Sequence, residues 1–379
     1  MSILKFSMRV FTSFLLLSVF SFETYASRAR SQALASSFHL LDSTQTYNNP
    51  LYAFYMPNQV VFEPGLTTPT SQTNNAEVFG LYELPSENRI LLSLGHVPQL
   101  VYEGRQFINS AASLNYSQAQ NPLRLGYLFK TSDLSHAVVT DFSQLNNKVT
   151  GQSEKSFVLG YGLEMGRWHF VTEVVAQNDA ELAGGLRFNG AGSFKVGVYY
   201  GADTTHFFFT YGRSQLKSYL DDKLRESHHV QNFAFALVDS SLREENEFFW
   251  GLQVKSVKTD CLDTAAALTC QQSANRVTLP VWFGVETQAA SFLKLRASFT
   301  QTALFNIQKD SVGYPALAFE GGEGAVNEYT SGPNSTAVAM GLGWMLGPRL
   351  TLDGLLGAAG SQIINMTNFL SQVSLTYDY

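Results

Sequence analysis

Alternating apolar and polar side chains recur along most of this chain in segments of about ten residues. In the segment SFLKLRASFT (residues 291–300), one set of alternate positions holds Leu293, Leu295, Ala297 and Phe299, and polar side chains lie between them. Because successive side chains of a β-strand point to opposite faces, a period of two predicts strands with one apolar and one polar face. Seventeen such segments can be counted between residue 60 and the C-terminus.

The connections between these segments are of two kinds. Tight turns at 201–204, 287–290 and 346–349 alternate with long polar loops at 213–229, 258–275 and 303–334. An outer-membrane barrel has this asymmetry, with turns on the periplasmic side and loops outside. Threading the strands from the two ends of the chain assigns opposite sides to the loop 98–122, so one segment between 120 and 212 is not a separate strand. A closed single-chain barrel needs an even number, so we expect 14 or 16 strands.

Composition supports the same fold class. Charged residues make up only 15% of the chain, against roughly 25% in soluble domains, yet after residue 26 no segment has 18 consecutive apolar residues. A soluble all-β protein and a transmembrane barrel both fit these facts, and the separation of turns from loops favours the barrel. We therefore predict an all-β fold, a transmembrane antiparallel up-and-down β-barrel over residues 58–379.

The N-terminus has the layout of a secretory signal peptide. Lys5 and Arg9 precede an apolar run from Val10 to Phe22, and small residues surround Ala26. The run is shorter than the roughly 17 residues of a membrane-spanning helix, which argues against a retained anchor. We predict cleavage after Ala26, with residues 1–26 as the signal peptide. Combined with the barrel, this predicts the outer membrane of a Gram-negative bacterium as the location.

Net charge and cysteine content limit the classes of partner and ligand that the chain can bind. The formal net charge is −6, and an acidic chain argues against nucleic acid as a partner. Cys261 and Cys270 are the only cysteines, and in an exported protein so close a pair predicts a disulfide. No cluster of His, Asp or Glu with zinc-ligand spacing accompanies them, so we expect neither a metal nor a cofactor.

The last strand carries a terminal signature. Val373, Leu375, Tyr377 and Tyr379 occupy alternate positions, and the chain ends on an aromatic residue. This resembles the C-terminal signal that the outer-membrane barrel-assembly machinery reads, with Tyr in place of the more frequent Phe. The expected partners are therefore that machinery and outer-membrane lipid. We also expect this strand to close the barrel against the first one.

Charged residues on the polar faces of strands predict the lining of the lumen. Lys294 and Arg296 alternate with apolar residues, and a Lys or Arg facing lipid at the bilayer midplane costs about 2–4 kcal/mol. They should therefore point inward. The same argument places inside the barrel Arg124, Lys130, Arg187, Lys195, Gln253 and Lys255, with the acidic residues Glu286 and Asp353. This predicts a lumen that leans basic, either as charge pairs in a packed or plugged barrel or as a ladder with anion preference in a water-filled pore.

Residues 27–57 form a candidate plug ahead of the first strand. The segment runs from an Arg-Ala-rich stretch, Arg28 to Ala35, through Asp42 to Asn49 and Pro50. This order resembles the N-terminal hatch of the long-chain fatty-acid transporter family of outer-membrane barrels, although Leu51 stands where that family has Ala. The resemblance implies a 14-stranded barrel whose lumen is blocked by the hatch and which passes small hydrophobic compounds. The alternative is a periplasmic tail that merely leads into the first strand.

Three functions remain open at this point, none of them enzymatic. They are a passive channel for small molecules, including hydrophobic compounds that pass the hatch, a general porin with weak anion preference, and a structural or adhesive surface protein without transport. The adjacent Ser135 and His136 point to opposite faces of a strand, so they cannot form a nucleophile and base pair. Nothing in the sequence identifies the substrate.

Overall fold

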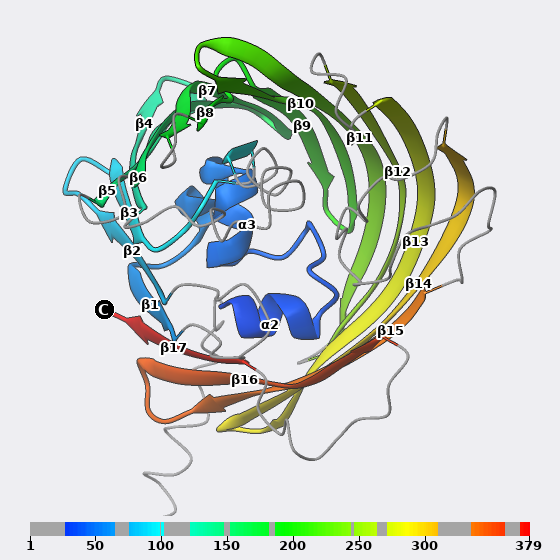
Figure 1. Ribbon diagram of the computed structural model, residues 1–379. Coiled ribbons are helices and arrows are strands. Elements are labelled where there is room, and N and C mark those ends of the chain that lie inside the picture. The colour runs from blue at the N-terminus through cyan, green and yellow to red at the C-terminus, as the bar shows by residue number, and fades with distance from the viewer. Residues whose placement is uncertain are drawn as a thin grey trace, which may run out of the picture.

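The computed structural model describes residues 27–64, 76–98, 100–101, 122–147, 152–181, 186–243, 246–263, 271–309, 335–360 and 372–379. All described strands belong to one antiparallel sheet that closes on itself (Figure 1). The predicted signal peptide and Cys270 lie outside the described residues, and of Cys261 only the backbone is described.

Seventeen strands make up the described wall. In chain order they are β1 Gln59–Glu63, β2 Glu77–Glu83, β3 Arg89–Leu94, β4 Leu123–Thr131, β5 Leu134–Asn147, β6 Gln152–Met165, β7 Trp168–Glu181, β8 Leu186–Asn189, β9 Phe194–Ala202, β10 Thr205–Leu220, β11 Lys223–Arg243, β12 Asn246–Asp263, β13 Gln271–Ala290, β14 Leu293–Lys309, β15 Ser335–Met345, β16 Leu350–Gly360 and β17 Gln372–Asp378.

The two short strands β8 and β9 share one position in the wall. Both pair with β7 on one side and with β10 on the other, so the barrel is 16-stranded. Counting 181–188 and 192–201 as separate strands was wrong, and this error caused the conflict over loop 98–122. The count of fourteen that the resemblance implied is also wrong.

A glycine-containing bend interrupts this shared position. Gly192 has φ +84°, which L side chains rarely adopt. The bend stays bonded to the wall, because Gly192 N donates to the Val175 carbonyl at 2.9 Å and Gln215 N donates to Ser193 Oγ at 3.0 Å. The wall is therefore continuous at this point, although the strand is not.

The barrel closes between its first and last strands. β17 pairs with β1, placing Val60 opposite Tyr377 and Phe62 opposite Leu375, which confirms the predicted closure. In β17 the polar side chains Ser374 and Thr376 are buried, whereas Tyr377 is exposed on the other face. The apolar face of the terminal strand therefore points out of the barrel.

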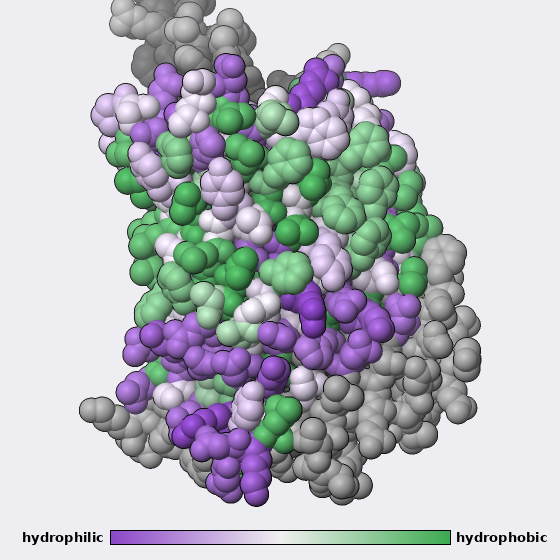
Figure 2. All heavy atoms as spheres, turned by 90° about the horizontal axis from the view of Figure 1, so that it is seen from above, coloured by the Kyte–Doolittle hydropathy of each residue, from purple (hydrophilic) through white to green (hydrophobic). Residues whose placement is uncertain are grey.

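Large apolar side chains cover much of the outer surface. Among those exposed by more than a third are Tyr127, Val138, Leu159, Phe170, Phe233, Phe283 and Phe299. Figure 2 shows such side chains as a broad green band, with a purple hydrophilic belt beside it. So extensive an apolar exterior is unfavourable in water and fits the lipid-facing band of a transmembrane barrel. No helix in the described ranges is long and apolar enough to cross a membrane.

Two ends of the barrel can be distinguished. The turn end holds the tight connections after β4, β6, β9 and β13, together with residue 58 and Tyr379, and the opposite one is the loop end. Residues 287–290, predicted as a turn, belong to β13 instead. Much of the three predicted long loops is strand, and β10 and β11 meet in a tight turn at Asp221 and Asp222. These extensions project beyond the apolar band, where the outward positions become polar and the alternation that marks a strand disappears.

The N-terminal segment lies within the ring of strands in Figure 1. We call residues 27–57 the inner segment; it contains α2 (Arg28–Ala33), α3 (Ser43–Asn48) and the 3₁₀ helix η1 (Pro50–Tyr55). Each helix begins at a capping side chain. Ser27 accepts from Arg30 N, Asp42 from Gln45 N and Asn49 from Leu51 N. The Asn49-Pro50 pair thus starts η1, because Pro fits the first position of a helix.

Candidate functional site

A chain of buried charges joins α2 to the wall. Arg30 Nε donates to Glu286 Oε2 at 2.8 Å, and Arg296 Nε donates to the same carboxylate at 2.5 Å. Arg296 Nη1 also donates to Asp353 Oδ1 at 2.5 Å, and Ser27 Oγ donates to Asp353 Oδ2 at 2.9 Å. We call these five residues the α2 anchor. All are buried, so each charge depends on its partners for the stabilisation that water would otherwise provide.

A second group of contacts surrounds Glu77 of β2. Its carboxylate accepts hydrogen bonds from Arg28 and from the Tyr47 hydroxyl. Arg28 also lies 3.3 Å from Glu63 of β1, and the Tyr47 ring stacks on His96 with centroids 3.5 Å apart. Both α2 and α3 are therefore attached to the first two strands, through the side chains Arg28 and Tyr47.

Arg124 of β4 is a deeply buried cation of the wall, at 1% exposure. Its guanidinium lies 3.6 Å from Asp141 and 3.1 Å from Glu173, and it donates to the Tyr47 carbonyl at 3.4 Å. It also lies over the Tyr47 ring, 5.4 Å from the centroid. Two carboxylates thus balance its charge while it holds the end of α3.

The junction of α3 and η1 contacts β7 and β9. Lys195 Nζ donates to Asn48 Oδ1 at 3.0 Å, and the Tyr199 hydroxyl donates to the Asn48 carbonyl at 3.2 Å. The Asn49 amide lies 2.8 Å from His169 Nδ1. The inner segment is therefore bonded to strands on several sides of the lumen.

Between these polar contacts lies an apolar region, which we call the inner apolar wall. It consists of Tyr199, Phe208, Phe249 and Trp282, with smaller side chains such as Val238 beside them. Leu34, Phe38 and Leu40 of the inner segment pack on it. The Phe38 ring centroid lies 5.4 Å from that of Phe208 and 6.5 Å from that of Trp282. The inner segment thus covers aromatic side chains that face the lumen.

A Ser, a His and a Glu meet at the edge of this region. Ser37 Oγ lies 2.9 Å from His39 Nδ1, and His39 Nε2 lies 3.1 Å from Glu247 Oε1. Hydrolases use the same residue types, but Ser37 is only 1% exposed and its hydroxyl accepts a hydrogen bond from Trp282 Nε1 at 3.1 Å. A substrate could not reach the hydroxyl in this state, so the group serves to hold the segment.

The predicted lumen residues fall into three sets. In the first set, Arg124, Lys195, Glu286 and Asp353 contact the inner segment as described above, and Lys130 lies over the Phe54 ring at 5.6 Å. Arg296 and Lys294 belong to the same set through Glu286, to which Arg296 donates and from which Lys294 lies 3.7 Å away. Gln253 and Lys255 are half-buried on the same face of β12 as Phe249. The third set is Arg187 alone, 55% exposed beside Glu181 and Asp222.

Arg187 does not line the lumen. It alternates with buried Phe188 in β8 and lies opposite Tyr219, whereas Phe188 lies opposite buried Ser218. Arg187 therefore points outward, near the loop end. The assumption that an outward Arg must meet lipid was wrong here, because this part of the wall lies beyond the apolar band.

The sequence reasoning also missed most of the acidic residues of the wall. The buried charged residues of the described strands are the cations Arg124 and Arg296 and the acids Glu63, Glu77, Asp141, Glu154, Glu173, Glu286 and Asp353. The expected basic lean is therefore wrong for the buried wall. Alternation could have placed several of these acids, since Val171, Glu173 and Val175 share one buried face of β7.

Comparison with known proteins gives likenesses of architecture only. No family model and no curated protein matches the chain. Among solved structures, a Pseudomonas aeruginosa FadL homologue is 10% identical with TM-score 0.40, covering 93% of this chain and 98% of its own. The CymD monoaromatic hydrocarbon channel is 11% identical with TM-score 0.38, covering 93% and 97%. OmpT of Vibrio cholerae is 9% identical with TM-score 0.39, covering 85% and 95%. At these values the likenesses carry no argument about function.

Proposed function

We propose that this protein is a passive channel of the Gram-negative outer membrane for small hydrophobic molecules, with the inner segment closing its lumen. The observation that carries the proposal is the inner apolar wall. A water-filled porin has a polar interior, whereas here Tyr199, Phe208, Phe249 and Trp282 face the lumen and are covered by Phe38 and its neighbours. Such a surface can bind an apolar molecule once the cover moves.

The proposed location rests on the exterior and the ends of the barrel. The outward apolar side chains match a lipid-facing band, and the terminal strand carries the aromatic pattern ending in Tyr379. Both Tyr379 and the start of β1 lie at the turn end, which is the periplasmic side in outer-membrane barrels. The inner segment therefore enters the lumen from the periplasm.

The ion pairs of Arg28 and Arg30 with the wall determine how the channel opens. Separating Arg30 or Arg28 from its carboxylates leaves buried charges without partners, which costs about 3–5 kcal/mol when one partner is removed outright. Water entering a loosened lumen would reduce that cost by hydrating the charges. A ligand shifts the equilibrium only if it binds the open state better, and contact with the uncovered inner apolar wall provides that difference.

Bilayer recordings and tracer uptake test the proposal together. The full chain and a variant lacking residues 27–57, with residues 1–26 retained for export, are reconstituted in parallel. We expect low conductance from the full chain, large conductance from the deletion variant, and uptake of an apolar fluorescent tracer by vesicles holding the full chain. High conductance of the full chain would indicate a general porin instead. Neither conductance nor uptake in either form would leave the surface-protein interpretation.

A further inference from the structure

The outward side chains change character at one level of β5, β6 and β9. Going toward the loop end, Phe142 is followed two positions on by Gln144, and Phe157 by Lys155; on the strand position shared by β8 and β9, Phe194 gives way to Asn189. Two residues of a strand span about 7 Å, so the change is abrupt. On the face of the barrel viewed in Figure 2, the purple belt follows the green band directly. In a membrane, this level is that of the lipid headgroups.

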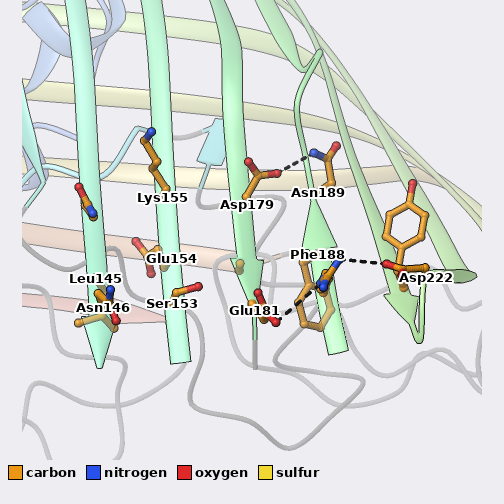
Figure 3. Close-up of a pocket in the computed structure, with 14 residues that line it drawn as sticks. Leu145, Asn146, Ser153, Glu154, Lys155, Asp179, Glu181, Phe188, Asn189 and Asp222 are labelled. Carbon is orange, nitrogen blue, oxygen red and sulfur yellow. Dashed lines mark hydrogen bonds and ion pairs between the residues drawn. The ribbon is translucent and has the colours of Figure 1, made fainter. Parts of the chain in front are cut away.

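A pocket of about 610 Å³ lies at this level, lined by residues of β5, β6, β7, β8 and the β10–β11 hairpin. Most of its lining side chains are polar and belong to the outward face. In Figure 3, Lys155, Asp179 and Asn189 come from three neighbouring strand positions, with Glu181 and Asp222 closer to the strand ends. The pocket is therefore open to the outside of the barrel and separate from the inner segment.

Several polar side chains of the pocket contact one another. Asp179 Oδ1 accepts from Asn189 Nδ2 at 2.7 Å, and its Oδ2 accepts from Gln177 Nε2 at 2.8 Å. Arg187 Nη1 donates to Asp222 Oδ1 at 2.9 Å, and Arg187 Nε lies 3.7 Å from Glu181 Oε1. Lys155 is paired in register with Asp179 on one side and Gln144 on the other. Because Asp179 and Asn189 already hold each other, this pair loses little entropy when it binds a ligand.

The chemistry of the pocket matches a phosphorylated sugar. Carboxylates and amides accept from and donate to sugar hydroxyls, and the cations Lys155 and Arg187 can contact a phosphate. An entirely anionic ligand would be repelled by Asp179, Glu181 and Asp222, and an entirely neutral one would leave Lys155 unused. A ligand with both hydroxyls and a phosphate uses the whole set.

We propose that this pocket binds the phosphorylated saccharide headgroup of an outer-leaflet glycolipid. The proposal rests on the outer-membrane location proposed above, because only a lipid in that leaflet places its headgroup at this level beside the wall. The acyl chains would then lie along the outward apolar side chains that begin directly below the pocket with Phe142 and Phe157 and continue with Leu159. One lipid would thus contact both the hydrophilic belt and the apolar band of the outer surface.

Binding of purified lipopolysaccharide to the delipidated full chain in detergent tests the proposal. The Lys155→Gln, Asp179→Asn double variant should raise the dissociation constant at least tenfold. Lys258→Gln is the matched control, because Lys258 is an exposed cation of β12 near the loop end and forms no part of this pocket; it should change the constant less than twofold. Retained heat modifiability on gels shows that the variants are folded.

Three outcomes would overturn the proposal: no binding by the unaltered chain, equal loss in the control, or equally tight binding of the deacylated saccharide, which would indicate a soluble sugar ligand instead. Tracer uptake and cell fractionation separate this proposal from the channel itself. The double variant should still fractionate with the outer membrane and take up tracer normally, since the pocket faces away from the lumen. Loss of those properties in the unaltered chain would contradict the proposed function rather than the pocket.

Discussion

Arg30 of the inner segment and Glu286 of β13 form a buried ion pair between residues 256 positions apart in the chain, with Nε and Oε2 at 2.8 Å. Glu286 is shared, because Arg296 also donates to it and Lys294 lies 3.7 Å away. One carboxylate is thus shared by three cations, although Arg296 is also paired with Asp353, and one of the three belongs to the segment that must move for the channel to open. Replacing Glu286 and replacing Arg30 should therefore release the inner segment to different extents.

Glu286→Gln should release the inner segment far more than Arg30→Gln. The first change leaves three cations near one another without their common anion, whereas after the second Glu286 keeps Arg296 and Lys294. An unpaired buried charge costs about 3–5 kcal/mol, so backbone amides of residues 27–57 should exchange hydrogen about a hundredfold faster or more, since each 1.4 kcal/mol is about tenfold. Hydrogen exchange read by mass spectrometry measures this rate.

Arg167→Gln provides the control for this pair of variants. Arg167 lies 3.1 Å from Asp203, but both side chains are more than half exposed, and an exposed pair contributes at most about 1 kcal/mol. Exchange in residues 27–57 should not change. Equal acceleration by Arg30→Gln and Glu286→Gln would contradict the view that Glu286 is the centre of the anchor.

Phe38→Ala should uncover the inner apolar wall without disturbing the ion pairs. The half-buried Phe38 ring packs against Phe208 and Trp282, and the cost of about 3–5 kcal/mol for removing a fully buried aromatic ring is an upper bound for its loss. The closed state loses this contact while the open state does not, so vesicles with the variant should take up apolar tracer faster. Phe283→Ala is a suitable control, because Phe283 is an outward aromatic residue of β13, 53% exposed and paired with exposed Trp250. Slower uptake by Phe38→Ala would indicate that Phe38 guides the solute rather than covering its path.

Sequence reasoning predicted the fold well because alternation records which face of each strand meets lipid. The inward position of Arg296 follows from this alternation alone, and the closure of β17 on β1 was predicted from the aromatic pattern that ends in Tyr379. The positions of β8 and Arg187 did not follow, because outside the lipid both faces of a strand can be polar. The partners of Arg30 could not be predicted either, since pairing between an internal segment and a distant strand leaves no local pattern. Recognition of Tyr379 by the assembly machinery and the Cys261–Cys270 disulfide stay predictions.

Docking of the inner segment should weaken as pH rises toward neutrality. Asp42 caps α3 in a fully buried position, and burial raises its pKa from 3.8 to about 7, with Arg30 opposing the shift and Glu63 adding to it. The docked state therefore holds a proton between about pH 4 and 7 that the released state gives up. Its contribution is complete below pH 4 and is lost as pH rises through 7. Three pKa units correspond to about 4 kcal/mol as an upper bound.

Asp42→Asn should abolish this pH dependence, because asparagine can still accept from Gln45 N while carrying no charge. Exchange rates of residues 27–57, corrected for the intrinsic effect of pH, should rise from pH 5 to pH 8 in the unaltered chain and stay flat in the variant. A rise of the same size in both proteins would show that another group is responsible.

Gly192→Ala should destabilise the barrel although it adds one methyl group. Gly192 has φ +84°, and a Cβ there would lie 2.8 Å from Gln215 Nε2. A side chain in such a conformation costs about 1–3 kcal/mol, and the bend cannot relax freely because its amide donates to the Val175 carbonyl. The matched control is Gly347→Ala in the turn after β15, where a Cβ would meet nothing within 4 Å. The temperature at which the barrel unfolds, read from heat modifiability on gels, should fall by several degrees for Gly192→Ala and stay unchanged for Gly347→Ala. If both variants unfold at the same temperature as the unaltered chain, the bend between β8 and β9 tolerates a side chain at position 192. The glycine would then not be needed for the stability of the wall.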